Sequence, residues 1–163
     1  MQPTAPLQLE DIVVQRNPHP VRPGLALNVW RVNVLLVEDD EADVELIRRA
    51  LRCQVDVGSI DVRRAPDVAL DDLRTGAVKP TIILLDIHMP KLDGFQFMRR
   101  LREIDHMREI PVVLLTTSRS LRDVEEARRS SACAYLVKPD QFEELKMCLD
   151  SLIKQAVVGK RRT

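Results

Sequence analysis

Short apolar runs recur along the chain from residue 32 onward, separated by longer stretches in which apolar and polar residues follow a helical period. Short runs rich in apolar and β-branched residues and bounded by polar positions are typical of buried strands. Five runs fit this description: Val32–Val37, Ile60–Arg63, Thr81–Leu85, Pro111–Leu115 and Ala134–Val137. Their alternation with helical stretches predicts an α/β fold, a doubly wound sheet of five mainly parallel strands.

Two of the intervening stretches show the helical period clearly. Val44, Ile47 and Leu51 form one apolar stripe after an acidic start, as expected for a helix that packs one face on a sheet. The apolar residues of the segment 141–156 recur at the same spacing of three and four, which predicts the last helix. We expect Asp40 to cap the first helix, because a short acidic side chain can accept from the free N–H groups of the first turn.

The beginning of the chain has a different composition from the rest. Five of the ten prolines fall in the first 23 residues, and each removes a backbone donor and favours extended conformations. We interpret residues 1–29 as a proline-rich extension, residues 30–157 as one folded domain and residues 158–163 as a basic tail. The mildly apolar segment Leu7–Gln15 either packs on the domain or a partner, or belongs to a disordered tail.

Composition narrows the classes of protein and of partner. With 25 basic and 25 acidic residues, the chain has no net charge to attract nucleic acid or an anionic membrane. No apolar run is long enough for a membrane span and no secretory signal begins the chain, which predicts a cytoplasmic location. The three cysteines, Cys53, Cys133 and Cys148, have no paired spacing, so we expect reduced, partly buried thiols.

The residues that end the predicted strands are the candidates for chemistry, because ligands of doubly wound sheets bind beyond the carboxyl ends of the strands. The ends of four runs carry polar groups at Glu38, Asp39, Asp86, Thr116 and Lys138. Crowded carboxylates repel one another unless a cation lies among them, and oxygen ligands suit Mg²⁺. With such an ion and a lysine nearby, Asp86 can act as a nucleophile toward phosphorus and form an aspartyl phosphate.

These residues resemble the motifs of response regulator receiver domains, such as the chemotaxis receiver, over Val32 to about Ala156. The motifs are "LLVEDDE", "ILLDIHMPKLDGF", "IPVVLLTTS" and "AYLVKP", with 30 residues from Asp86 to Thr116 and 22 from Thr116 to Lys138. The resemblance implies the flavodoxin-like (βα)5 fold with strand order 2-1-3-4-5. The "LLTTS" form is similar to small stand-alone regulators that pair with phytochrome-type histidine kinases.

The resemblance also implies a role for each site residue. Asp86 would be the phosphoacceptor and Lys138 and Thr116 its catalytic partners, and Thr116 and Tyr135 would be the switch residues. Mg²⁺ would be held by Glu38, Asp39, Asp86 and the backbone carbonyl of His88. The side chains of His88 and Ser118 would tune the loss of the phosphoryl group. Output would be a change of protein partner, including a homodimer through the surface of the fourth helix, fifth strand and fifth helix.

Simpler interpretations stand beside these. Asp86 alone would be a strand-end acid that caps a turn, His88 an exposed side chain, and Tyr135 a core aromatic. Arg128 and Arg129 form either a solvated face or a partner surface. Where the family has a glycine before the last strand, this chain has Ser130, Ser131 and Ala132, so we expect a differently built turn, since serine tolerates positive φ poorly.

Two functions from other classes compete with the receiver. A haloacid dehalogenase-type phosphohydrolase also forms an aspartyl phosphate, but it needs a second aspartate where this chain has His88. A degenerate receiver would act as a docking module independent of phosphorylation, and the intact Asp86, Thr116 and Lys138 argue against it. We therefore expect a phosphoryl-accepting signalling protein that does not turn over an external substrate.

Overall fold

The computed structural model describes residues 31–160. The expected extension 1–29 and the last residues of the expected tail, 161–163, lie outside the described residues. The elements follow one another in this order: β1 (Val32–Val37), α1 (Glu41–Arg52), β2 (Val57–Arg63), α2 (Pro66–Thr75), β3 (Ile82–Asp86), α3 (Gly94–Arg102), the short 3₁₀ helix η2 (Asp105–Met107), β4 (Val112–Thr116), α4 (Leu121–Arg129), β5 (Ala134–Val137) and α5 (Phe142–Lys160).

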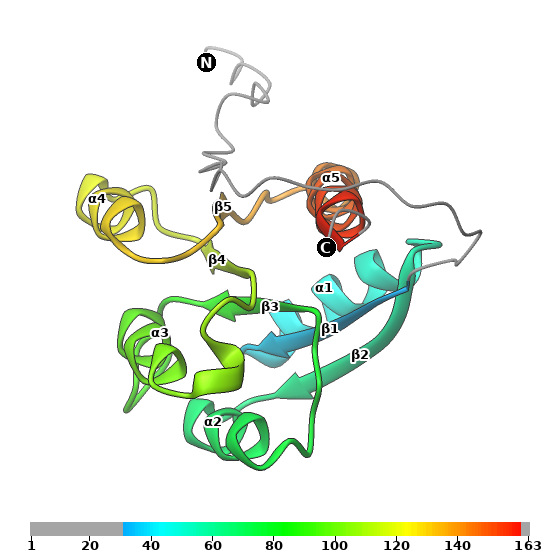
Figure 1. Cartoon of the computed structure of the whole chain (residues 1–163). Helices are drawn as coiled ribbons and strands as arrows, with labels where there is room; N and C mark the ends of the chain where they lie inside the picture. The colour runs from blue at the N-terminus through cyan, green and yellow to red at the C-terminus, as the bar shows by residue number, and fades with distance from the viewer. Residues whose placement is uncertain (1–30, 161–163) are drawn as a thin grey trace.

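Five parallel strands form one sheet in the order β2-β1-β3-β4-β5 (Figure 1). The predicted doubly wound, flavodoxin-like fold is therefore confirmed. Val37 pairs with Leu85, Asp86 with Leu115, and Thr116 with Val137. Because neighbouring strands run in the same direction in this register, the residues that follow them meet at one edge of the sheet.

The sheet lies between two layers of helices (Figure 1). Val34 and Leu36 of β1 belong to the core under α1 and α5, whereas Leu35 and Val37 belong to the core under α2, α3 and α4. This alternation follows from the period of two along a strand, and it explains why the runs are apolar throughout: both faces of each central strand are buried.

Helix ends follow local sequence signals. Asp40 is the N-cap of α1 and its Oδ1 accepts from the Asp43 backbone N–H at 2.9 Å, which confirms the predicted cap. Asp93 and Gln96 form a capping box at the start of α3. The largest differences from the predicted bounds are that β2 begins at Val57, before Ile60, and that α5 continues to Lys160. The strands β3 and β4 each lie one residue later than predicted.

The turn between α4 and β5 forms without a glycine, at Ser130, Ser131 and Ala132. Ser130 has φ −76°, and its hydroxyl donates to the Ala127 carbonyl at 2.7 Å and accepts from the Ala132 N–H at 3.2 Å. The guanidinium of Arg102 donates to the Ser131 hydroxyl and carbonyl, at 2.8 and 3.2 Å. Side-chain hydrogen bonds thus hold this turn without a residue at positive φ, as expected for a turn built from serines.

The three cysteines are free, but they differ in exposure. Cys133 and Cys148 are half-buried, as predicted. Cys53 is exposed instead, and it lies at the C-cap of α1. Over residues 31–160, no helix combines the length and apolarity needed to cross a membrane.

Candidate functional site

Four strand ends bring polar side chains together at one edge of the sheet. Glu38 follows β1, Asp86 ends β3, Thr116 ends β4 and Lys138 follows β5. Apart from Tyr135, the buried residues with polar side chains in the described part of the chain are Glu38, Asp86 and Thr116. Since burying a charged group is costly unless it is paired, these acids need a partner at the same place.

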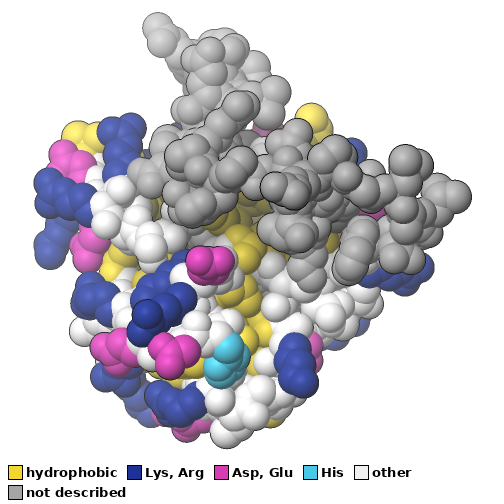
Figure 2. Space-filling model, in the orientation of Figure 1, with side chains coloured by type: hydrophobic (Ala, Val, Ile, Leu, Met, Phe, Trp, Pro, Cys, Tyr) yellow, Lys and Arg dark blue, Asp and Glu magenta, His cyan; other side chains and the backbone are white. Residues whose placement is uncertain are grey.

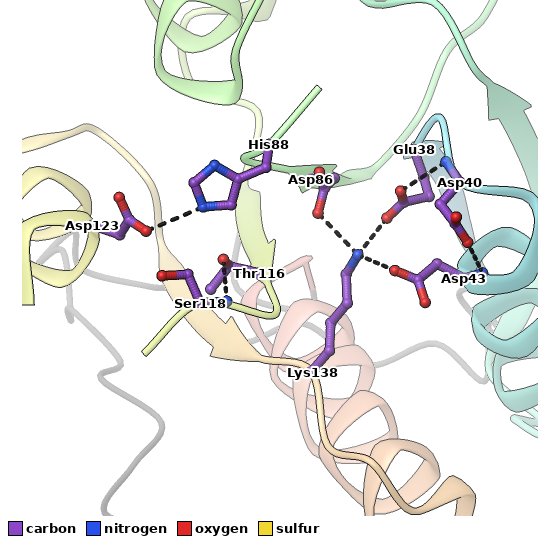
Figure 3. A network of polar contacts seen from close by, with 9 residues as sticks. All are labelled: Glu38, Asp40, Asp43, Asp86, His88, Thr116, Ser118, Asp123 and Lys138. Carbon is purple, nitrogen blue, oxygen red and sulfur yellow. Dashed lines mark hydrogen bonds and ion pairs between the residues drawn. The ribbon is translucent and has the colours of Figure 1, made fainter. Parts of the chain in front are cut away.

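Lys138 is that partner (Figure 3). Its Nζ donates to Glu38 Oε2 at 2.6 Å, to Asp43 Oδ2 at 2.6 Å and to Asp86 Oδ1 at 2.9 Å. The Lys138 side chain is 8% exposed, against 2% for Glu38 and 7% for Asp86. Such buried, charge-assisted hydrogen bonds fix the position of the ammonium beside Asp86.

Asp43 is the member of this cluster that the sequence did not reveal. It lies in the first turn of α1, and its side chain is 31% exposed. An acidic residue in the first turn of a helix is ordinarily explained by the helix dipole, so its residue type carries no separate signal. The one signal in the sequence is its position, three residues after the N-cap Asp40 and six after the end of β1, which places Asp43 near the carboxyl edge of the sheet.

The cluster changes the proton affinity of its members. Burial alone would lower the pKa of Lys138, but hydrogen bonds to Asp43, Glu38 and Asp86 outweigh it and raise that pKa above its ordinary value. For Glu38, burial raises the pKa, and the hydrogen bond from Lys138 opposes this effect only in part. Lys138 therefore favours its charged form. Because three carboxylates share this one ammonium, the site has more acidic groups than basic ones.

The excess of acidic groups suits a hard divalent cation. Glu38, Asp39 and Asp86 each offer a carboxylate oxygen, and these oxygens lie within 4.8 Å of one another. Carboxylate oxygens are the ligands that Mg²⁺ and Mn²⁺ prefer, with water completing the shell. Asp40 is committed elsewhere, because its side chain caps α1. The residues present therefore fit a Mg²⁺ site, with the His88 carbonyl at the adjoining loop as the fourth predicted ligand.

A glycine lets α3 begin directly against the Asp86 backbone. A Cβ on Gly94 would lie 2.6 Å from the Asp86 carbonyl oxygen and 2.9 Å from the Ile87 Cα. The Gly94 N–H donates to the Ile87 carbonyl at 2.9 Å. Because both close neighbours are backbone atoms, no other residue fits here without moving the Asp86 backbone.

The Thr116 hydroxyl faces the loop that follows β4. Thr116 Oγ1 accepts from the Ser118 N–H at 2.9 Å, and Ser118 Oγ accepts from the Ser120 N–H at 3.1 Å. Tyr135 is buried, and its hydroxyl donates to the Ser118 carbonyl at 3.2 Å. Both predicted switch residues therefore contact the same short loop between β4 and α4, next to the site.

His88 connects the loop after β3 to helix α4. Its Nε2 lies 3.1 Å from Oδ2 of Asp123, and the imidazole extends between Asp86 and α4 (Figure 3). The His88 side chain is 53% exposed, whereas that of Asp123 is 15% exposed. Sequence reasoning missed Asp123, because an acid in the first turn of a helix again has an ordinary explanation.

The surface on the α3 and α4 side carries both signs of charge (Figure 2). Arg128 and Arg129 are exposed, and Arg129 lies 4.0 Å from Glu125 on the same helix. Interspersed charges of this kind are typical of a solvated helix face. The mixed pattern favours the simpler of the two interpretations of this basic pair.

Comparisons with known proteins agree on one family. The response regulator receiver domain model matches residues 34–150. The probable methanogenesis regulatory protein FilR2 of Methanothrix harundinacea is 38% identical over 134 residues, 80% of this chain and 86% of that protein. The phosphorylated cyanobacterial phytochrome response regulator RcpA aligns with a TM-score of 0.71 at 26% identity, covering 78% of this chain and 94% of that one. The Mn²⁺-bound response regulator Rcp1 aligns with a TM-score of 0.67 at 28% identity, covering 74% and 91%.

Proposed function

Because the chain belongs to the family of response regulator receiver domains, we propose that it is a phosphorelay switch that accepts a phosphoryl group on Asp86. The family consists of two-component signalling proteins rather than enzymes that turn over an external substrate. The observation that carries the proposal is the 2.9 Å contact between Lys138 Nζ and Asp86 Oδ1 inside a buried acidic cluster. A carboxylate with a fixed cation beside it can approach an anionic phosphoryl group, which an isolated carboxylate repels.

Asp86 is the nucleophile in this proposal. One of its carboxylate oxygens attacks the phosphorus of a phosphohistidine, and a P–O bond forms while the P–N bond breaks. The leaving imidazole keeps the electron pair of the broken bond and takes a proton from solvent. Lys138 binds an oxygen of the transferring group and offsets its charge, and the product is an aspartyl phosphate.

The side chains of Glu38, Asp39 and Asp86 and the backbone carbonyl of His88 are the groups that would hold Mg²⁺. When bound, Mg²⁺ would supply positive charge that offsets the repulsion between the carboxylates and the phosphoryl oxygens. Glu38 is buried and fixed by the Lys138 ammonium and by the Asp40 N–H, at 2.6 and 3.1 Å. Its oxygens are therefore already in place before any cation arrives, which favours binding.

In this proposal, Thr116 and Tyr135 transmit the phosphorylation of Asp86 to the surface of α4, β5 and α5. The Thr116 hydroxyl turns to donate to a phosphoryl oxygen, and its bond from the Ser118 N–H is then lost. The loop between β4 and α4 moves as a consequence, and so does the Ser118 carbonyl that holds the Tyr135 hydroxyl. Since α4 begins at Leu121, directly after this loop, the surface of α4, β5 and α5 changes its binding properties.

The proposed donor is a histidine kinase, and the similarity to a phytochrome response regulator favours a kinase of the phytochrome type. Such kinases form phosphohistidine from ATP, so we place the reaction in the cytoplasm. One output is a homodimer through the α4-β5-α5 surface, where Leu121 and Met147 are 80% and 70% exposed. Exposed apolar side chains of this size are candidates for burial in a protein interface.

The test is a phosphorylation assay with the small donor acetyl phosphate, read by intact mass. We expect one added phosphoryl group that requires Mg²⁺ and is lost in Asp86→Asn. The matched control is Asp105→Asn, which removes an exposed aspartate of η2 that pairs with Arg108. This variant should be phosphorylated to the same extent as the unchanged protein.

Two results would contradict the proposal. Modification that persists in Asp86→Asn would place the acceptor elsewhere. No modification with any donor, and no binding of Mg²⁺, would favour the alternative of a docking module that works without phosphorylation.

A further inference from the structure

The three N–H bonds of the Lys138 ammonium are all directed at carboxylates. They point to Glu38, Asp43 and Asp86, and the two contacts on the α1 side, at 2.6 Å each, are shorter than the 2.9 Å contact with Asp86. In Figure 3, Glu38 and Asp43 lie on one side of the ammonium, whereas Asp86 lies on the side of Thr116. A lysine that is to bind a phosphoryl oxygen near Asp86 must therefore give up one of these bonds.

We propose that Asp43 is a positioning residue that holds Lys138 toward α1 and competes with the phosphoryl group for its ammonium. The inference rests on the proposed function, because it concerns the stability of the phosphorylated form of Asp86. Asp43 thereby limits how long or how fully the switch stays on.

Asp43 differs from Glu38, the other acid on that side of the ammonium. Glu38 belongs to the group of oxygens that fits a divalent cation, and Asp43 does not. Among the side chains of residues 31–156, the Asp43 side chain bonds to Lys138 alone. The backbone N–H of Asp43 donates to Asp40 Oδ1 in the helix cap, so a change of the Asp43 side chain leaves that cap in place. A substitution of Asp43 thus removes its bond to Lys138 and its charge, and leaves the group of metal-binding oxygens unchanged.

The direction of the effect follows from charge. A phosphoryl group adds negative charge beside Asp86, and Lys138 can offset it only as far as it is released by Asp43. The negative charge of Asp43 also repels the phosphoryl oxygens directly. Both effects disfavour the phosphorylated form, so removal of the charge should favour it.

The experiment measures binding of beryllium trifluoride, a tetrahedral mimic of the phosphoryl group on aspartate, by fluorine NMR at saturating Mg²⁺. Asp43→Asn should bind it about twofold to fivefold more tightly than the unchanged protein, the range expected for one ion-pair partner at a partly exposed site. Glu45→Gln is the control, because it removes one negative charge from the same helix at a 64% exposed side chain that pairs with Arg48 at 3.8 Å. Asp43→Glu restores the acid and should return the affinity to about that of the unchanged protein, which a purely structural effect of residue 43 would not produce.

The outcomes separate the two proposals. If the unchanged protein fails to bind beryllium trifluoride with Mg²⁺, the proposed function fails. If it binds, but Asp43→Asn binds no more tightly than Glu45→Gln, the competition by Asp43 is refuted. Should Asp43→Asn fail to fold, Asp43→Ser tests the same charge, with the same result supporting or overturning the inference.

Discussion

His88 Nε2 lies 3.1 Å from Asp123 Oδ2, so a hydrogen bond joins the residue two positions after Asp86 to the first turn of α4. The contact holds an exposed imidazole between Asp86 and α4 (Figure 3). Without Asp123 the side chain would sample several rotamers, because nothing else in the described part of the chain bonds to it.

The first prediction concerns this imidazole. His88→Ala should shorten the lifetime of the aspartyl phosphate about twofold to fivefold, the effect of up to about 1 kcal/mol on a barrier, because water reaches the phosphorus more easily. Asp123→Ala should also shorten this lifetime, because it removes the hydrogen bond that holds the His88 imidazole. The measurement is the decay of phosphorylated protein by intact mass, with Glu125→Ala, an exposed change on the same helix, as control. An unchanged lifetime in both variants would show that His88 does not shield the site.

The second prediction concerns the stability of the acidic cluster. Lys138→Met should lower the free energy of unfolding in urea, without divalent cations, by about 3–5 kcal/mol, because it leaves buried carboxylates without a cation. Adding Asp86→Asn in the Lys138→Met background should recover part of the loss, since it removes one of the repelling charges. Lys146→Met is the control, because Lys146 is 38% exposed and contacts Glu143 at 3.4 Å. A double variant as unstable as the single one would contradict a loss caused by charge repulsion.

The third prediction concerns the metal. Mg²⁺ at about a hundred times its dissociation constant should add about 2.7 kcal/mol of stability, which is about 5–10 °C in melting temperature for a domain of this size. Asp39→Asn should abolish most of this increase, because it removes one of three oxygens in the cluster. Differential scanning calorimetry with and without Mg²⁺ measures both, and Asp105→Asn should keep the full increase. An equal increase in Asp39→Asn would locate the ion elsewhere.

The fourth prediction concerns Tyr135, the one tyrosine of the chain. Burial raises the pKa of its phenol above the ordinary value of 10.0, and the charge of Asp123 raises it further. The near-ultraviolet absorbance of the phenolate should therefore titrate above about 10 in the folded protein and near 10 after unfolding. Since the folded state retains the proton more strongly, stability should fall as the pH rises above about 10. Asp123→Asn should lower the midpoint in the folded protein, and a midpoint that does not move would show that the Asp123 charge does not reach the phenol.

Much of the fold could be predicted from the sequence, because it follows from local patterns. The apolar runs predict β1 and β5 at the bounds observed, and the other three strands within a few residues. Asp40 caps α1 as its position ahead of an apolar stripe indicates. Local steric preferences and hydrogen bonds decide such features, so a short stretch of sequence suffices to predict them.

The candidate site could be predicted only in part. Parallel strands end at one edge of a sheet, so the positions of Glu38, Asp86, Thr116 and Lys138 at the ends of apolar runs are enough to predict that they meet. The contact of Lys138 with Asp43 and that of His88 with Asp123 could not be expected. Both acids lie in the first turn of a helix, where the helix dipole already explains them.

The order of residues along the chain therefore suffices for the sheet, its carboxyl edge and the residues that end its strands. Tertiary packing was needed to decide which side of each helix reaches that edge, and with it which carboxylates share the Lys138 ammonium. The reason is physical: hydrophobic packing on the sheet sets the rotation and position of α1 and α4, and a change of about 100° in rotation, one residue of helix, would turn these acids toward solvent.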